Sequence, residues 1–198
     1  AMKMVSAAKL RRAQDAITQM RPYAQKLQEM LSNIVSTTEG DLSIKLAETR
    51  AVENVLLIVI TSDRGLCGGY NANLIKLAKS TIAEKYSSQF NKGNVTIWNI
   101  GKKGYESLTK AGYTTDATFK DIFLQLSFEN VQAAAAAAMK AFEDKTFDAV
   151  EVIYSEFKNA ASQEYKAEAF LPIPKVKSTG AAKKSDFIFE PAKEELIA

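Results

Sequence analysis

The chain has 198 residues, of which 46% are hydrophobic and 25% are charged, with a formal net charge of +3. This length and composition predict one globular domain with an extension, and so small a charge does not by itself indicate a nucleic-acid partner. No apolar run approaches the ~18–20 residues of a membrane-spanning helix. One cysteine and no histidine exclude an internal disulfide and Ser-His or Cys-His catalysis, and disfavour a zinc or other soft-metal site.

The first 39 residues are expected to form one long helix, because no glycine precedes Gly40. Apolar or small residues recur in this segment at alternating spacings of four and three, a 3.5-residue average that predicts a left-handed coiled coil. At 1.5 Å per residue the helix would be roughly 58 Å long, so we expect much of it to project from a compact domain. The predicted seam consists of Ser6, Leu10, Ala13, Ile17, Met20, Ala24, Leu27, Leu31 and Ile34.

Pro22 lies inside this predicted helix and conflicts with a straight rod. Proline has no backbone N–H and its ring crowds the preceding turn, so we expect a bend or a local adjustment there. An amphipathic helix that lies on its own domain is the alternative interpretation of the same periodicity.

Strands and helices alternate after residue 50. The run NVLLIVITS at residues 54–62 is continuous and apolar, which is typical of a strand buried on both faces. The alternation predicts an α/β domain, Rossmann-like, with a mostly parallel sheet. Further strands are expected at 94–100, 147–157 and 164–172, helices at 71–86, 101–111 and 128–143, a basic loop at 172–185, an extended piece at 186–190 and a helix beginning at Pro191.

The sharpest local motif is ITSDRGLCGGYNANL at residues 60–74, which leads from a strand through glycines into a helix. Such a loop could cradle a phosphate on helix amides, but its glycines match neither the P-loop nor the dinucleotide-binding pattern. A tight strand-to-helix turn that needs positive φ and close backbone approach is the preferred interpretation. The turn residues are Gly65, Cys67, Gly68 and Gly69, and Cys67 is expected to be a largely buried free thiol.

Two segments carry a family resemblance. MKMVSAAKLRRAQ at residues 2–14 and SDRGLCGGYNANL at residues 62–74 resemble the best-known segments of the gamma subunit of F-type ATP synthase. RPYAQKL at 21–27 and FIFEPAKEEL at 187–196 also fit, so the likeness covers essentially the whole chain in order. The form GLCGGYN is similar to bacterial members.

The resemblance implies a long N-terminal coiled-coil helix wound against a C-terminal helix and flanked by the α/β domain. It divides the chain into a shaft helix at 1–50, the α/β domain at 51–190 and the start of the second helix at 191–198, and we expect the chain to be truncated at both ends. The implied function is that of a central rotor stalk, which couples transmembrane ion flow to ATP synthesis or hydrolysis by rotation and is not itself catalytic.

The implied partners are the alpha and beta subunits of the catalytic head, the epsilon subunit and the membrane c-ring. The resemblance implies no catalytic residue, cofactor, metal or nucleic acid, and no membrane insertion; the location would be peripheral, on the cytoplasmic face of the bacterial inner membrane. Residues 1–12 carry four basic side chains and no acid, which suits an acidic surface on the beta subunits. The residues carried over as beta-subunit contacts are Met2, Lys3, Lys9, Arg11 and Arg12.

Two other functional classes match parts of the sequence. A nucleic-acid binder would use the basic first helix, but no recognition fold or stacking aromatic residues accompany it. A small α/β enzyme would use the loop at Asp63 and Arg64, but no nucleophile and base accompany that pair. Salt-sensitive DNA affinity would favour the first alternative, and turnover by the isolated chain would favour the second.

Overall fold

The computed structural model describes residues 2–37, 45–159 and 162–173. The chain divides into two units, one containing the long helix α1 and the other comprising residues 44–174. The expected extended piece at 186–190 and the expected helix from Pro191 lie outside the described residues. The boundaries proposed at residues 50 and 190 stay predictions.

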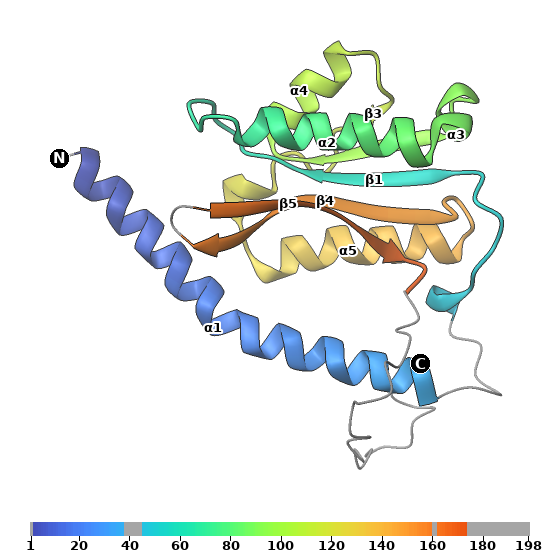
Figure 1. Cartoon of the computed structure of the whole chain (residues 1–198), viewed down its shortest axis with the longest axis horizontal. Helices are drawn as coiled ribbons and strands as arrows, with labels where there is room; N and C mark the ends of the chain where they lie inside the picture. The colour runs from blue at the N-terminus through green and yellow to red at the C-terminus, as the bar shows by residue number, and fades with distance from the viewer. Residues whose placement is uncertain (1, 38–44, 160–161, 174–198) are drawn as a thin grey trace. The chain divides into compact units, whose positions relative to one another are not determined.

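Helix α1 spans Met2–Thr37 and has 36 residues, so the long N-terminal helix is confirmed. It continues through Pro22, and Figure 1 shows that it is bent rather than straight. Pro22 cannot donate to the carbonyl of Thr18, one turn earlier. The Thr18 hydroxyl donates to the carbonyl of Gln14 at 2.8 Å, a back-bond that also tends to bend helices. The bend expected from the sequence is therefore present in α1.

The second unit is built on a five-stranded sheet with the order β3-β2-β1-β4-β5. The four strands from β3 to β4 are parallel, and β5 runs antiparallel to β4. The mostly parallel sheet predicted from the alternation of strands and helices is confirmed. The strands are β1 (Val55–Ile60), β2 (Val95–Ile100), β3 (Thr115–Asp116), β4 (Ala149–Asn159) and β5 (Ser162–Leu171).

Helices cover both faces of the sheet, with α2 and α4 on one side and α5 on the other (Figure 1). This arrangement buries the apolar strands on both faces, as a parallel sheet requires. The helices of this unit are α2 (Tyr70–Lys85), α3 (Ser87–Asn91), α4 (Lys102–Lys110) and α5 (Phe128–Glu143), with short 3₁₀ turns η1 (Lys45–Ala47) and η2 (Ile122–Gln125).

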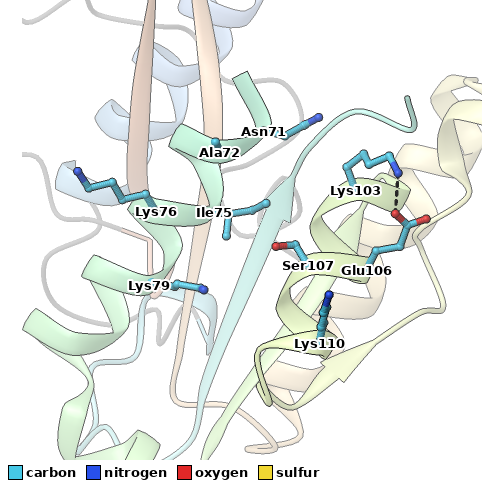
Figure 2. Close-up of a pocket in the computed structure, with 9 residues that line it drawn as sticks. All are labelled: Asn71, Ala72, Ile75, Lys76, Lys79, Lys103, Glu106, Ser107 and Lys110. Atoms are coloured by element: carbon cyan, nitrogen blue, oxygen red, sulfur yellow. Dashed lines mark hydrogen bonds and ion pairs between the residues drawn. The ribbon is translucent and has the colours of Figure 1, made fainter. Parts of the chain in front are cut away.

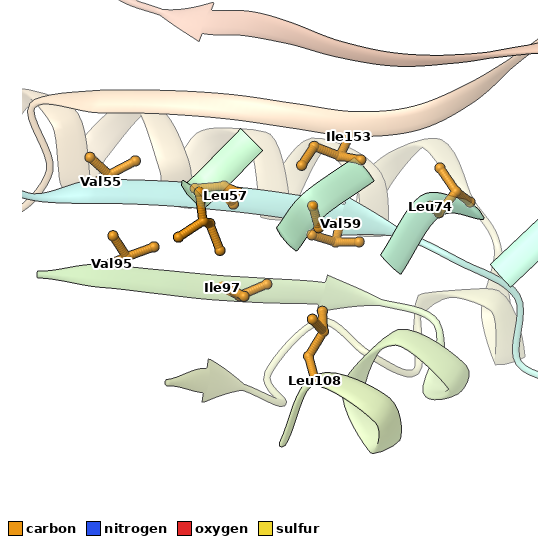
Figure 3. Close-up of a cluster of buried hydrophobic side chains, with 10 residues drawn as sticks. Val55, Leu57, Val59, Leu74, Val95, Ile97, Leu108 and Ile153 are labelled. Atoms are coloured by element: carbon orange, nitrogen blue, oxygen red, sulfur yellow. The ribbon is translucent and has the colours of Figure 1, made fainter. Parts of the chain in front are cut away.

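The central strand β1 forms the middle of the core. Its alternate residues Val55, Leu57 and Val59 pack with Leu74 of α2 and Leu108 of α4 (Figure 3). On the opposite face, Leu56 and Ile58 pack with Ala138 and Phe142 of α5 and with Val150 of β4. The expectation that residues 54–62 contain a strand buried on both faces is confirmed.

The carboxyl ends of β1 and β2 lie side by side, which brings two loops together. The Thr61 amide donates to the Ile100 carbonyl at 2.8 Å, and the Lys103 amide donates to the Ser62 carbonyl at 3.1 Å. The glycine-rich loop after β1 is therefore anchored beside the start of α4.

Candidate functional site

The first turns of α1 present a basic surface. Lys3, Lys9, Arg11 and Arg12 are all exposed, and the first turn contains no acidic residue. Within the described part of the chain, no acidic side chain pairs with any of these four. An uncompensated cluster of cations on a helix is suited to contact with an acidic surface.

Apolar side chains are exposed on the same helix. In the predicted seam, Leu10 is 51% exposed, Met20 is 59% exposed and Leu27 is 47% exposed. The small seam residues Ser6, Ala13 and Ala24 are also exposed, and Ile17 is half-buried. For Met2, Leu31 and Ile34, only the helical backbone is described. The seam therefore stays a prediction, but most of it lies open to a partner.

The sequence reasoning missed three further exposed apolar residues on α1: Met4, Val5 and Tyr23. They lie outside the alternating four-three spacing, so a search for a two-helix seam cannot find them. Met4 and Val5 lie near the start of the helix and Tyr23 lies near its middle, and large exposed apolar side chains of this kind occur at protein interfaces. Their presence widens the apolar part of α1 beyond one stripe.

The glycine-rich turn uses positive φ at two residues. Gly68 has φ of 60° and Leu66 has φ of 62°, a conformation that costs energy for a side chain such as leucine. Gly69 is the N-cap of α2 and has φ of −77°, and a Cβ on Gly65 would meet no atom within 4 Å. The positive φ expected at the glycines of this turn is therefore observed at Gly68. The second residue with positive φ is Leu66, not Gly65.

The expectation that Cys67 is buried is wrong. Cys67 is exposed, because β1 ends at Ile60 and residues 64–69 all lie at the surface before α2 begins. Its Sγ accepts a hydrogen bond from Asn71 Nδ2 at 3.2 Å and lies 3.8 Å from Ser62 Oγ. The thiol is therefore accessible while it contacts the start of α2.

The start of α4 does not form a phosphate cradle. The amide of Lys102 donates to Asp63 Oδ1 at 3.1 Å, and the amide of Gly104 donates to Thr61 Oγ1 at 2.8 Å. Together with the bond between Lys103 and Ser62, these contacts engage the first amides of the helix within the chain, where an anion would otherwise bind. Asp63 therefore caps α4. This structural role explains why an acidic side chain stands in the loop without the catalytic function that the enzyme alternative assigned to it.

The described residues contain no cluster of three or more acidic, Cys or His side chains able to hold a metal. Among the same residues, no helix is long and apolar enough to cross a bilayer.

Comparison with known proteins identifies the family. A family model described as ATP synthase matches residues 1–198. The ATP synthase gamma chain of Cytophaga hutchinsonii is 46% identical over 201 residues, covering 100% of this chain and 68% of the relative. The chain belongs to the ATP synthase gamma-chain family. The gamma chain of Flavobacterium johnsoniae is also 46% identical, over 197 residues, covering 100% of this chain and 67% of the relative.

The fold agrees with this family. The structure matches a chain of the Tetrahymena thermophila mitochondrial ATP synthase central stalk and c-ring with a TM-score of 0.57 and 27% identity, covering 87% of this chain and 71% of that one. As a gamma chain, the protein is a central-stalk subunit of the F-type ATP synthase and does not carry the catalytic site. The resemblance found in the sequence motifs is confirmed.

Proposed function

We propose that α1 is the rotating shaft of the stalk and that Met2, Lys3, Lys9, Arg11 and Arg12 contact acidic surfaces of the beta subunits. The observation that supports this most directly is the exposed basic cluster at the start of α1, which has no acidic partner among the described residues. A charged surface that moves past the beta subunits in turn would favour a different conformation in each. Rotation would then couple to ATP chemistry as a shift in populations driven by differential contacts.

The exposed seam of α1 would be covered by a second helix of the stalk. Leu10, Met20 and Leu27 are each about half exposed, so covering what remains of them would stabilise the pair by roughly 1 kcal/mol per side chain, about half the value for full burial. In this proposal, residues 1–50 form the shaft and the α/β domain forms the base of the stalk. That base would meet the epsilon subunit and the membrane c-ring, with the alpha and beta subunits around the shaft. The complex would lie at the cytoplasmic face of the bacterial inner membrane.

The test is charge reversal at Arg11 and Arg12 in the assembled complex. Both side chains lie outside the predicted seam, so the variant should fold normally while ion pumping per ATP hydrolysed falls. The matched control is Lys92→Glu with Lys145→Glu, which reverses two exposed charges in the α/β domain. Equal coupling in the Arg11→Glu, Arg12→Glu variant and the control would rule out the proposed contact. Unfolding of the α/β domain by the same variant would show that the cluster is structural.

A further inference from the structure

A groove lies between α2 and α4, the two helices that cover one face of the sheet. Its volume is about 650 Å³. In Figure 2, Ile75 and Lys79 point from α2 toward α4 and Ser107 points back toward α2, whereas Lys76 extends away from α4 at the rim. The lining residues are Asn71, Ala72, Ile75, Lys76 and Lys79 of α2 with Lys103, Glu106, Ser107 and Lys110 of α4.

The groove concentrates positive charge. Four lysines and one glutamate line it, so its net charge of +3 equals the formal net charge of the whole chain. The single acid, Glu106, is engaged by Lys103 at 2.7 Å. Within the described part of the chain, none of Lys76, Lys79 and Lys110 has an acidic partner. The lining therefore carries an excess of positive charge that an anionic partner would neutralise.

The groove is not only basic. Ala72 and the half-buried Ile75 supply apolar surface between the lysines. Lys79 is half-buried, and its Nζ lies 5.8 Å from the centre of the Tyr113 ring, a cation–π distance. The cation of Lys79 is thus positioned rather than extended freely into solvent. A complementary partner would combine carboxylates with at least one apolar side chain.

We propose that this groove binds an acidic, amphipathic polypeptide segment of another protein in the assembly. A small phosphate ligand is a poorer match, because the first amides of α4 are already hydrogen-bonded within the chain and the lysines are spread along two helices instead of gathering at one helix start. A membrane surface is disfavoured because, among the described residues, neither α2 nor α4 exposes a large apolar side chain that could insert. Carboxylates along a helix or strand match lysines spread along two helices better than either alternative does.

The proposal rests on the chain working inside a larger complex. It concerns the α/β domain, and the contact proposed above concerns α1, so the two can fail separately. Reversal of Arg11 and Arg12 should leave binding at the groove unchanged.

The experiment places a photo-reactive residue at the rim of the groove in the purified ATP synthase complex. The variant is Lys110→p-benzoylphenylalanine, and the control is Lys92→p-benzoylphenylalanine, at an exposed lysine of the same domain outside the groove. After irradiation, the cross-linked peptide is identified by mass spectrometry. We expect one dominant product from the groove, a polypeptide segment with an excess of Asp and Glu, which the control does not give.

Charge reversal then tests the role of the lysines. Adding Lys76→Glu and Lys79→Glu should lower the yield of that product at least about fivefold, since each lost ion pair weakens binding modestly, and added salt should lower it further. Adding Lys145→Glu instead should leave the yield unchanged. No cross-link at Lys110, a product with a lipid, or a segment without excess acid would overturn the proposal. So would a yield that the Lys76 and Lys79 substitutions do not change.

Discussion

Arg50 Nε donates to Asp148 Oδ1 at 2.7 Å, joining the segment before β1 to the residue just before β4. The same guanidinium donates to the carbonyls of Phe142 and Phe147 at 2.7 and 2.6 Å, and its centre lies 4.2 Å from the Phe142 ring centroid. Asp148 Oδ2 accepts from the amides of Glu53 and Asn54. The pair therefore fixes both the entry to β1 and the turn after α5.

Replacing Arg50 should destabilise the α/β domain strongly. Both side chains of the pair are mostly buried, and loss of one partner leaves the other charge without compensation. Arg50→Ala should lower the free energy of unfolding by ~3–5 kcal/mol, measured by urea denaturation. Arg50→Lys should recover only part of this loss, because an ammonium group cannot reproduce the planar fork of hydrogen bonds. A change below about 1 kcal/mol in Arg50→Ala, the range of exposed ion pairs, would contradict this role.

Asp148 should make stability depend on acid pH. Burial raises the pKa of its carboxyl, but hydrogen bonds from the Asn54 and Glu53 amides and from Arg50 outweigh that effect and hold the pKa below its ordinary value. A depressed folded-state pKa stabilises the protein above the unfolded value of 3.8, and this contribution is lost as the pH falls through the folded value.

The measurement is urea unfolding from neutral pH to below about pH 4, the ordinary range of an aspartate pKa. The advantage of the wild-type chain over Asp148→Asn should be largest near neutrality and shrink as the pH falls. An advantage that stays constant across the range would show that Asp148 is not the titrating group.

Gly104 should be intolerant of alanine although it lies in a helix. A Cβ at this position would lie 2.8 Å from Thr61 Oγ1 and 3.1 Å from Asn99 Oδ1, and both of those residues are buried. Overpacking typically costs ~1–3 kcal/mol, which offsets or exceeds the helix-propensity gain of about 1 kcal/mol.

Gly104→Ala should therefore lower the urea midpoint or, at best, leave it unchanged. Gly65→Ala is the control, because a Cβ there meets nothing within 4 Å, and its effect should stay within about 0.5 kcal/mol. A clear rise in the urea midpoint of Gly104→Ala would contradict this prediction, because it would show that Thr61 and Asn99 can move away from the added methyl group without loss of stability.

Much of this fold could be predicted from local pattern. The run VLLIVI of β1 is apolar throughout because both of its faces are covered, and the predicted bounds of α5 coincide with those observed. Ser127 caps α5 by accepting from the Asn130 amide at 3.3 Å, and an alanine-rich body follows. In such segments the local preference of the residues and their burial in the fold favour the same structure, so the element can be predicted from the sequence alone.

Other features depend on packing between distant segments. Strand β3 has only two residues, Thr115 and Asp116, and exists because Ile97 and Trp98 of β2 offer their free edge. The exposure of Cys67 depends on how the loop leaves the sheet, with Leu66 in a conformation that leucine rarely adopts. The groove lysines come from two helices that only the sheet brings together. No local sequence pattern signals any of the three.

Cys67 should react rapidly in the folded protein. It is exposed, and it is the only cysteine in the chain, so a polar thiol reagent reports on one site. Labelling of the native chain should proceed at a rate comparable to that of the urea-unfolded chain. The control is Leu57→Cys in a Cys67→Ser background, where the thiol would occupy a fully buried core position and should react far more slowly. Slow labelling of native Cys67 would restore the buried interpretation.

This chain is expected to rotate inside the catalytic head, and the exposed thiol of Cys67 allows a direct test. The chain would be assembled with alpha and beta subunits whose own cysteines have been replaced. The head would be fixed to a surface and a bead attached through Cys67. On addition of ATP, we expect continuous rotation of the bead in one direction, weakened by Arg11→Glu with Arg12→Glu. A stably assembled complex that hydrolyses ATP while the bead shows no directed rotation would contradict it.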